Sequence, residues 1–165
     1  MEMPVESAAA AGSRGRLVLA CRLLLAVVLL VTATGKLLDI GGFVAVVATY
    51  RALPEPLLLP AALTLTLGEL ALCLWLLSGV RLATAALAAV LLHVAYLVWS
   101  TAALARGLYI PNCGCFGVFW ARPLTWVTLV EDAVLLFVAL AIYRGARLRA
   151  AGGGRSSGTV QAAAS

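Results

Sequence analysis

Four long apolar segments limit what this chain can fold into. The chain has 165 residues, of which 64% are hydrophobic and 12% are charged. A helix needs about 20 consecutive apolar residues to cross a bilayer, so the length leaves room for four crossings and little else. A membrane-crossing segment must satisfy its own backbone hydrogen bonds. The sequence therefore predicts an all-α integral membrane protein, a four-helix bundle.

The predicted spans are separated by short stretches rich in turn residues. The segment "LPEP" breaks the chain before the second span, and "SGVR" makes a tight connection between the second and third. The fourth span contains Glu131 and Asp132, which shorten its apolar run. We expect the spans at about residues 17–35, 57–77, 82–104 and 124–143 of a single membrane domain, residues 17–143.

The two ends of the chain differ in composition from the spans. Residues 1–16 and residues 144–165 are rich in small and polar residues, and the second of these segments is basic. Such segments cannot bury enough apolar surface to fold, so we expect both to be disordered tails. A cleaved signal peptide ending near "VTA" is an alternative interpretation of the first apolar run.

The distribution of basic residues predicts the orientation in the membrane. With four spans, the two termini and the connection at residues 78–81 share one side. That side carries six basic residues against four on the other, and cytoplasmic loops are the richer in Lys and Arg. The two sets are Arg14, Arg16, Arg81, Arg144, Arg147 and Arg149 against Lys36, Arg51, Arg106 and Arg122. We therefore expect a multi-pass cell-membrane protein with both termini cytoplasmic. The basic charge flanks the spans and indicates no nucleic-acid partner.

The stretch "PNCGCFG" places Cys113 and Cys115 on either side of Gly114, in a loop predicted to be extracytoplasmic. Disulfides form and persist in that compartment. A bridge between residues two apart closes a very small loop and stabilises little, so its value would be chemical. Strained, exposed disulfides are more oxidising than structural ones. Gly114 permits the tight turn, and Arg106 and Arg122 can stabilise a thiolate.

Two other interpretations of the thiol pair stay open. The cysteines could be small, partly buried residues without chemistry. They could also bind a copper-type ion, although a closed zinc site needs four ligands and this loop supplies two. A cluster of aromatic residues at the outer ends of the third and fourth spans is typical of the headgroup region. These residues, which we expect to hold the loop at the membrane surface, are Trp99, Tyr109, Phe116, Phe119, Trp120 and Trp126.

A set of motifs resembles the MauE family of methylamine-utilisation membrane proteins, which is related to DoxX-like redox-associated four-helix membrane proteins. The resemblance covers roughly residues 17–143. Its motifs are "ATGKLLD", "FVAVVATYRALP", "GEL", "ARGLYIPNCGCFG" and "LTWVTLVEDAVLL". The residues that carry over are Cys113, Gly114, Cys115, Phe116 and Gly117, with Gly35 and Lys36 in support. The pair Glu131 and Asp132 departs from the family pattern, so no role is assigned to it.

The resemblance implies a role in maturing a disulfide-containing extracytoplasmic protein, in the founding case a subunit of methylamine dehydrogenase. We therefore expect a thiol–disulfide redox factor in which Cys113 and Cys115 are catalytic and Gly114, Phe116 and Gly117 shape the loop. Its expected partners are the lipid bilayer and an extracytoplasmic thioredoxin-like protein or client. The alternatives are a metal-binding or transport protein that uses the same thiols, and a noncatalytic assembly factor.

Two ionisable residues lie inside predicted spans. Glu69 and His93 fall on inward-facing stripes of the second and third spans, so we expect them to pair near mid-membrane. Such a pair could join helices, relay protons or lie beside a quinone. No cofactor motif is evident, and a quinone stays open. Quinone-linked disulfide generators usually have a second cysteine pair or a quinone pocket, so the sequence predicts an oxidoreductase component and not a self-sufficient oxidase.

Overall fold

The computed structural model describes residues 4–162, with side-chain detail over residues 12–150. The described part is helical, with one extended loop and no strand. Its elements are α1 (Pro4–Leu38), α2 (Ile40–Thr49), α3 (Glu55–Ser78), α4 (Leu82–Ala105) and α5 (Trp126–Ala162). In these residues, four helices contain segments long and apolar enough to cross a membrane: Gly12–Leu38, Glu55–Ser78, Leu82–Ala105 and Trp126–Ala150. The predicted all-α fold with four membrane-crossing helices is confirmed.

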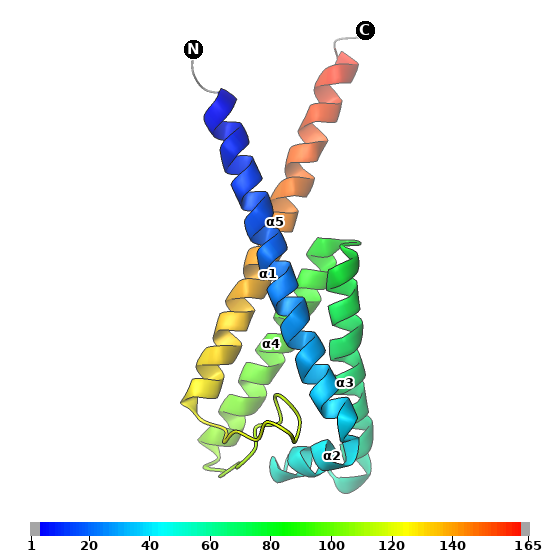
Figure 1. The fold of residues 1–165 in the computed structure, drawn as a ribbon, viewed down its shortest axis with the longest axis vertical. Coiled ribbons are helices and arrows are strands. Elements are labelled where there is room, and N and C mark those ends of the chain that lie inside the picture. Colours follow the sequence, from blue (N-terminus) through cyan, green and yellow to red (C-terminus); the bar gives the residue numbers. More distant parts are fainter. Residues whose placement is uncertain (1–3, 163–165) are drawn as a thin grey trace.

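The four long helices form one bundle. Helix α1 packs against α3 and α5, and α4 packs against α5 and α3. Large apolar side chains that face outward, such as Leu24 and Leu91, are exposed to the surrounding lipid. Figure 1 shows the beginning of α1 and the end of α5 at one end of the molecule, and α2 and the loop of residues 106–125 at the other. The cysteine loop therefore lies at the end opposite both termini, and the side of the membrane that each end faces stays a prediction.

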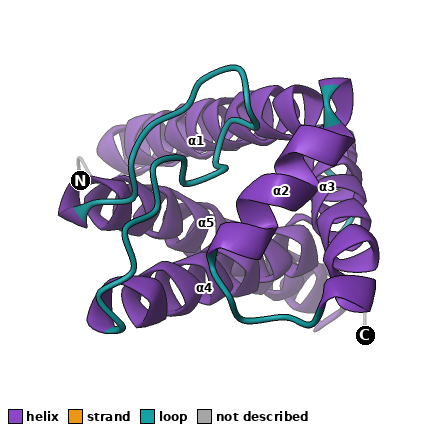
Figure 2. Ribbon diagram, turned by 90° about the horizontal axis from the view of Figure 1, so that it is seen from below, coloured by secondary structure: helices purple, strands orange, loops and turns teal. Residues whose placement is uncertain are grey.

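Helix boundaries follow local chemistry. The side chain of Asp39 caps α2 by accepting a hydrogen bond of 2.8 Å from the Gly42 N–H. Pro54 precedes α3 in an extended conformation, and Gly79 ends that helix in the left-handed region. The short helix α2 was not predicted. Its ten residues form a continuous apolar run that follows α1 after the single residue Asp39, so the sequence does not set it apart from the first span. In Figure 2, α2 and the loop lie over the same end of the bundle.

The tails differ from the prediction. The backbone of α1 is helical from Pro4, and that of α5 is helical to Ala162, so helix extends through most of both segments predicted to be disordered. Each segment continues a membrane-crossing helix, so no new helix has to be nucleated. The remaining residues of the predicted tails, 1–3 and 163–165, lie outside the described residues.

Two groups of buried apolar residues form the core. One lies between the long helices and includes Leu25, Leu29, Leu76 and Ile142. The other joins α2 to the cysteine loop and includes Phe43, Tyr50, Ile110 and Cys113. The second group packs the loop against the bundle, so the loop is an integral part of the folded structure.

Candidate functional site

The cysteine loop is held by its own backbone. Cys113 donates its N–H to the carbonyl of Arg122 at 2.7 Å, and Leu124 donates to Ile110 at 2.9 Å. These two bonds pair the beginning of the loop with its end. The side chain of Asn112 accepts from the Gly114 N–H at 2.9 Å and donates to the Gly117 carbonyl at 3.2 Å. One amide therefore fixes the backbone on both sides of the thiol pair.

Glycines allow the loop to approach α1. A Cβ on Gly35 would lie 2.4 Å from the Phe116 carbonyl oxygen, and a Cβ on Gly117 would lie 2.3 Å from the Gly35 oxygen. Gly117 and Gly114 also have positive φ angles, +73° and +77°. The two backbones meet at a distance that no side chain allows. This contact explains in physical terms why Gly35 and Gly117 occur in the same set of motifs.

The two thiols differ in their surroundings. Their Sγ atoms lie 2.9 Å apart, and the Cys115 N–H donates to Cys113 Sγ at 3.5 Å. Cys113 is buried and Cys115 is half-buried. The hydrogen bond with the Cys115 thiol lowers the pKa of Cys113 to about 7, while burial opposes this shift and Arg122 contributes to it. The same hydrogen bond, together with burial, raises the pKa of Cys115. Cys113 is therefore the thiolate of the pair.

Side chains from three regions support the pair. Tyr50, at the end of α2, donates its hydroxyl to the Cys113 carbonyl at 2.8 Å. Arg106 donates to the Tyr50 carbonyl at 3.0 Å. Arg122 forms an ion pair with Glu131 and lies over the Phe116 ring, 5.6 Å from its centroid. Glu131 thus has a structural role, because its carboxylate orients the loop arginine.

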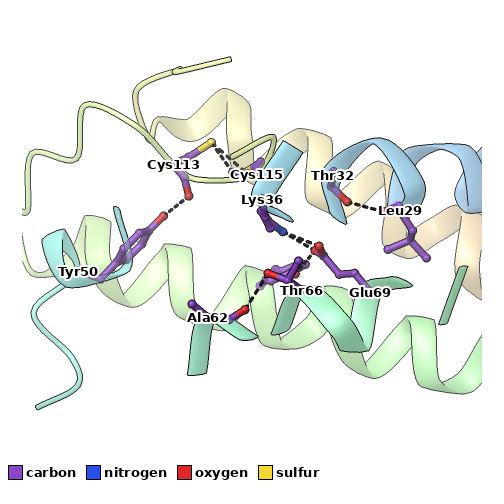
Figure 3. Close-up of polar contacts among 10 residues, drawn as sticks. Leu29, Thr32, Lys36, Tyr50, Ala62, Thr66, Glu69, Cys113 and Cys115 are labelled. Atoms are coloured by element: carbon purple, nitrogen blue, oxygen red, sulfur yellow. Dashed lines mark hydrogen bonds and ion pairs between the residues drawn. The ribbon is translucent and has the colours of Figure 1, made fainter. Parts of the chain in front are cut away.

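The predicted pairing of Glu69 with His93 is corrected by the structure. Glu69 accepts two hydrogen bonds from Lys36, at 2.6 and 2.7 Å, and a third from the Tyr96 hydroxyl. The Nδ1 atom of His93 instead lies 2.8 Å from the Ala89 carbonyl of its own helix. Lys36 reaches Glu69 because its side chain faces the interior of the bundle, where the ammonium and the carboxylate attract each other strongly. In Figure 3, Lys36 lies between the cysteine pair and Glu69.

One cavity joins the thiols to the buried ion pair. It has a volume of about 310 Å³ and is lined by both cysteines, Lys36, Glu69, His93 and Tyr96, with mostly apolar residues around them. Asp132, which is buried, also lines it. Among the residues with described side chains, no group of three or more His, Cys, Asp or Glu could hold a metal ion.

The lowered pKa of Cys113 predicts a distinct alkylation profile. In a Cys21→Ser/Cys73→Ser background, the reduced protein should react with iodoacetamide at a rate that rises through pH 7, because the thiolate is the nucleophile. Below this pH the thiol form predominates, and above it the rate levels off. Cys115→Ala removes the side-chain donor that is the main cause of the shift, so the midpoint should move to higher pH. Mass spectrometry after timed labelling measures both. An identical midpoint in the two proteins would contradict the assignment.

The sequence located most of the site but not its connections. Cys113, Gly114, Cys115, Phe116 and Gly117 lie together in the loop, as drawn from the motif. Gly35 contacts this loop and Lys36 lines the same cavity. Asn112 and Tyr50 were missed as supporting residues. The position of Asn112 directly before the first cysteine was the available signal, since Asn side chains often fix turns.

Comparisons with known proteins identify the family of the chain. The model of the family described as methylamine utilisation protein MauE matches residues 14–144. The methylamine utilization protein MauE of Paracoccus denitrificans is 31% identical over 126 residues, which are 76% of this chain and 68% of that protein. No solved structure matches the chain. The matched region takes in the cysteine loop and most of each membrane-crossing helix, and it shows that this chain belongs to the MauE family.

Proposed function

We propose that this protein is a membrane thiol–disulfide exchange factor that helps to mature an extracytoplasmic, disulfide-containing protein in methylamine utilisation. The pathway comes from the name of the Paracoccus denitrificans relative. The observation that carries the chemistry is the pair of sulfur atoms 2.9 Å apart in a preformed loop, with a pKa of about 7 for one of them.

The asymmetry gives each cysteine a role. When the pair is oxidised, a client thiolate attacks Sγ of Cys115, the more exposed of the two residues. The Cys113–Cys115 bond breaks, a client–Cys115 bond forms, and Cys113 leaves as a thiolate, which its low pKa favours. A second client thiolate then attacks the client sulfur of this mixed disulfide. The client gains a disulfide, and the pair takes up its two electrons and is left as a dithiol.

The location of the loop supports an extracytoplasmic client. The loop lies at the end of the bundle opposite both termini, and the basic residues favour cytoplasmic termini. Exposed aromatic side chains at the loop end, among them Tyr109, Trp120 and Trp126, suit the headgroup region. A soluble partner can reach a loop held at this depth.

Trapping the mixed disulfide tests the proposal. In Cys113→Ser the pair cannot be oxidised, but the Cys115 thiolate can attack a disulfide of the oxidised client, which is the reverse of the exchange. The client disulfide breaks, its other sulfur leaves as a thiolate and a client–Cys115 bond forms. Because Cys113 is absent and cannot release this bond, a reducible adduct should accumulate in cells grown on methylamine. Non-reducing electrophoresis and mass spectrometry identify it. The matched control, Cys115→Ser, should give a much weaker adduct, because Cys113 is buried. Labelling intact cells with a membrane-impermeant maleimide checks the side of the loop.

Two results would contradict the proposal. One is the absence of an adduct from either single variant when the protein is present in the membrane. The other is normal client maturation in the Cys113→Ser/Cys115→Ser double variant, which would leave a noncatalytic assembly role.

A further inference from the structure

The cavity below the thiol loop has the composition of a small-molecule site. Its volume of about 310 Å³ is at the lower end of the range for ligand pockets, about 300–1,000 Å³. Aromatic rings line it, including those of Phe43, Tyr50 and Trp99. Ala95 and Trp99 are both lining residues and exposed on α4. The cavity therefore opens beside them, at a lipid-facing surface, and a ligand that reaches it from the membrane has an entrance.

The polar groups of the cavity are few and specific. The Lys36 ammonium has three N–H donors, and Glu69 accepts two of the hydrogen bonds it makes. The third donor is available to an acceptor in the cavity. Asp132 is buried, at about 9% exposed, and lines the cavity. Its carboxylate nevertheless forms no hydrogen bond or ion pair with another residue whose side chain is described. The site thus offers one cationic donor and one unpaired acid within apolar walls.

The reduced thiol pair needs an electron acceptor before it can exchange again. After exchange with a client, Cys113 and Cys115 hold two electrons as thiols. The other two cysteines cannot receive them by thiol exchange in this fold, because Cys73 donates to the Ala26 carbonyl inside the other core group and Cys21 packs against that group. The buried Cys113, in contrast, lines the cavity.

We propose that the cavity binds a membrane quinone, which accepts the electrons of the thiol pair; this inference rests on the proposed thiol-exchange function. A quinone is a flat, apolar ring with carbonyl acceptors, and its tail can leave through the opening beside Ala95. Lys36 donates to one quinone oxygen. Two thiols lose two electrons and two protons and form one S–S bond, while the quinone gains two electrons and two protons and becomes a quinol. Asp132 transfers protons between the thiols and the ring.

Binding and electron transfer can be measured separately in purified protein. Decylubiquinone is a suitable probe, because its fully substituted ring resists stable thiol addition. It should quench tryptophan fluorescence saturably, and Trp99→Phe should remove most of the saturable part. The protein, reduced and freed of reductant, should then form about one quinol per molecule in a single turnover. Cys113→Ser/Cys115→Ser should bind the quinone and form no quinol.

A filled cavity provides the matched comparison. Ala95→Phe places a ring at the opening and should weaken quinone binding about tenfold or more. Ala102→Phe makes the same change at an exposed position of α4 outside the cavity and should have no effect. No saturable quenching, or quinol formation that Ala95→Phe leaves unchanged, would overturn the quinone site. If the quinone site is overturned but Cys113→Ser still traps a client, the proposed exchange function stands without the quinone site.

Discussion

Lys36→Met should lower the free energy of unfolding by about 3–5 kcal/mol, because it leaves the Glu69 carboxylate buried without its cation. The Lys36 and Glu69 side chains are only 3% and 1% exposed. Glu69→Leu should cost a similar amount, since it leaves the ammonium unpaired. Breaking a buried ion pair by removing one partner is expensive even where the intact pair contributes little net stability.

The double variant distinguishes pairing from simple loss of packing. Lys36→Met/Glu69→Leu removes both charges, so its cost should be well below the sum of the two single costs. About 1–3 kcal/mol should remain, because the Tyr96 hydroxyl loses its acceptor. Adding Tyr96→Phe should recover most of that remainder. Unfolding in mixed detergent micelles, followed by circular dichroism, measures each variant.

His93 supplies the control for this cycle. Its Nδ1 atom contacts the carbonyl of Ala89, and its ring contacts that of Tyr96, which binds Glu69, so His93→Gln and Glu69→Gln should couple only weakly. Additive costs for Lys36→Met and Glu69→Leu would show that the buried ion pair does not form. A strong coupling between Glu69 and His93 would instead support the pairing that the sequence suggested.

The fold could be predicted because its strongest signal is local. Apolar runs of the length needed to cross a bilayer identify four helices without any knowledge of their packing. Helix α2 carries no such signal, since its apolar run directly continues the first span past Asp39. The partner of Glu69 could not be predicted for a related reason. Lys36 follows an apolar span, where a lysine usually reaches the membrane surface, and only the packing of α1 on α3 turns it inward.

The residues of the candidate site could be found in the sequence, but their surroundings could not. The spacing of Cys113 and Cys115 predicts a reactive pair whatever the fold, and this chemistry stays a prediction. The cavity, in contrast, is formed by residues from every helix, so it exists only once the bundle has assembled. The role of Tyr50 could not be predicted for the same reason, because its hydroxyl binds the carbonyl of Cys113, 63 positions further along the chain.

Gly117→Ala should have the second large effect, because it combines two costs. The new Cβ would lie 2.3 Å from the Gly35 oxygen, and the φ angle of +73° is unfavourable for alanine. Overpacking costs about 1–3 kcal/mol, and a left-handed residue about 1–2 kcal/mol. We expect a loss of about 2–5 kcal/mol in the free energy of unfolding, or a displaced loop that relieves the clash.

Three other glycines separate these costs. Gly35→Ala adds the contact alone, since its Cβ would lie 2.4 Å from the Phe116 oxygen and no positive φ is involved. Gly107→Ala adds the backbone strain alone, because its φ is +67° and nothing lies within 4 Å. Gly68→Ala, in α3 with open space around it, adds neither and should be neutral or slightly stabilising.

The alkylation midpoint of Cys113 connects this series to function. If the loop position sets the low pKa, Gly35→Ala and Gly117→Ala should both raise the midpoint, because a displaced loop loses the alignment of the two thiols. Gly107→Ala and Gly68→Ala should leave it unchanged, whatever they do to stability. If stability falls in Gly35→Ala and Gly117→Ala without a change in the midpoint, the contact between the loop and α1 only holds the fold together. A raised midpoint in those two variants alone would show that the close approach of the two backbones shapes the reactive thiol.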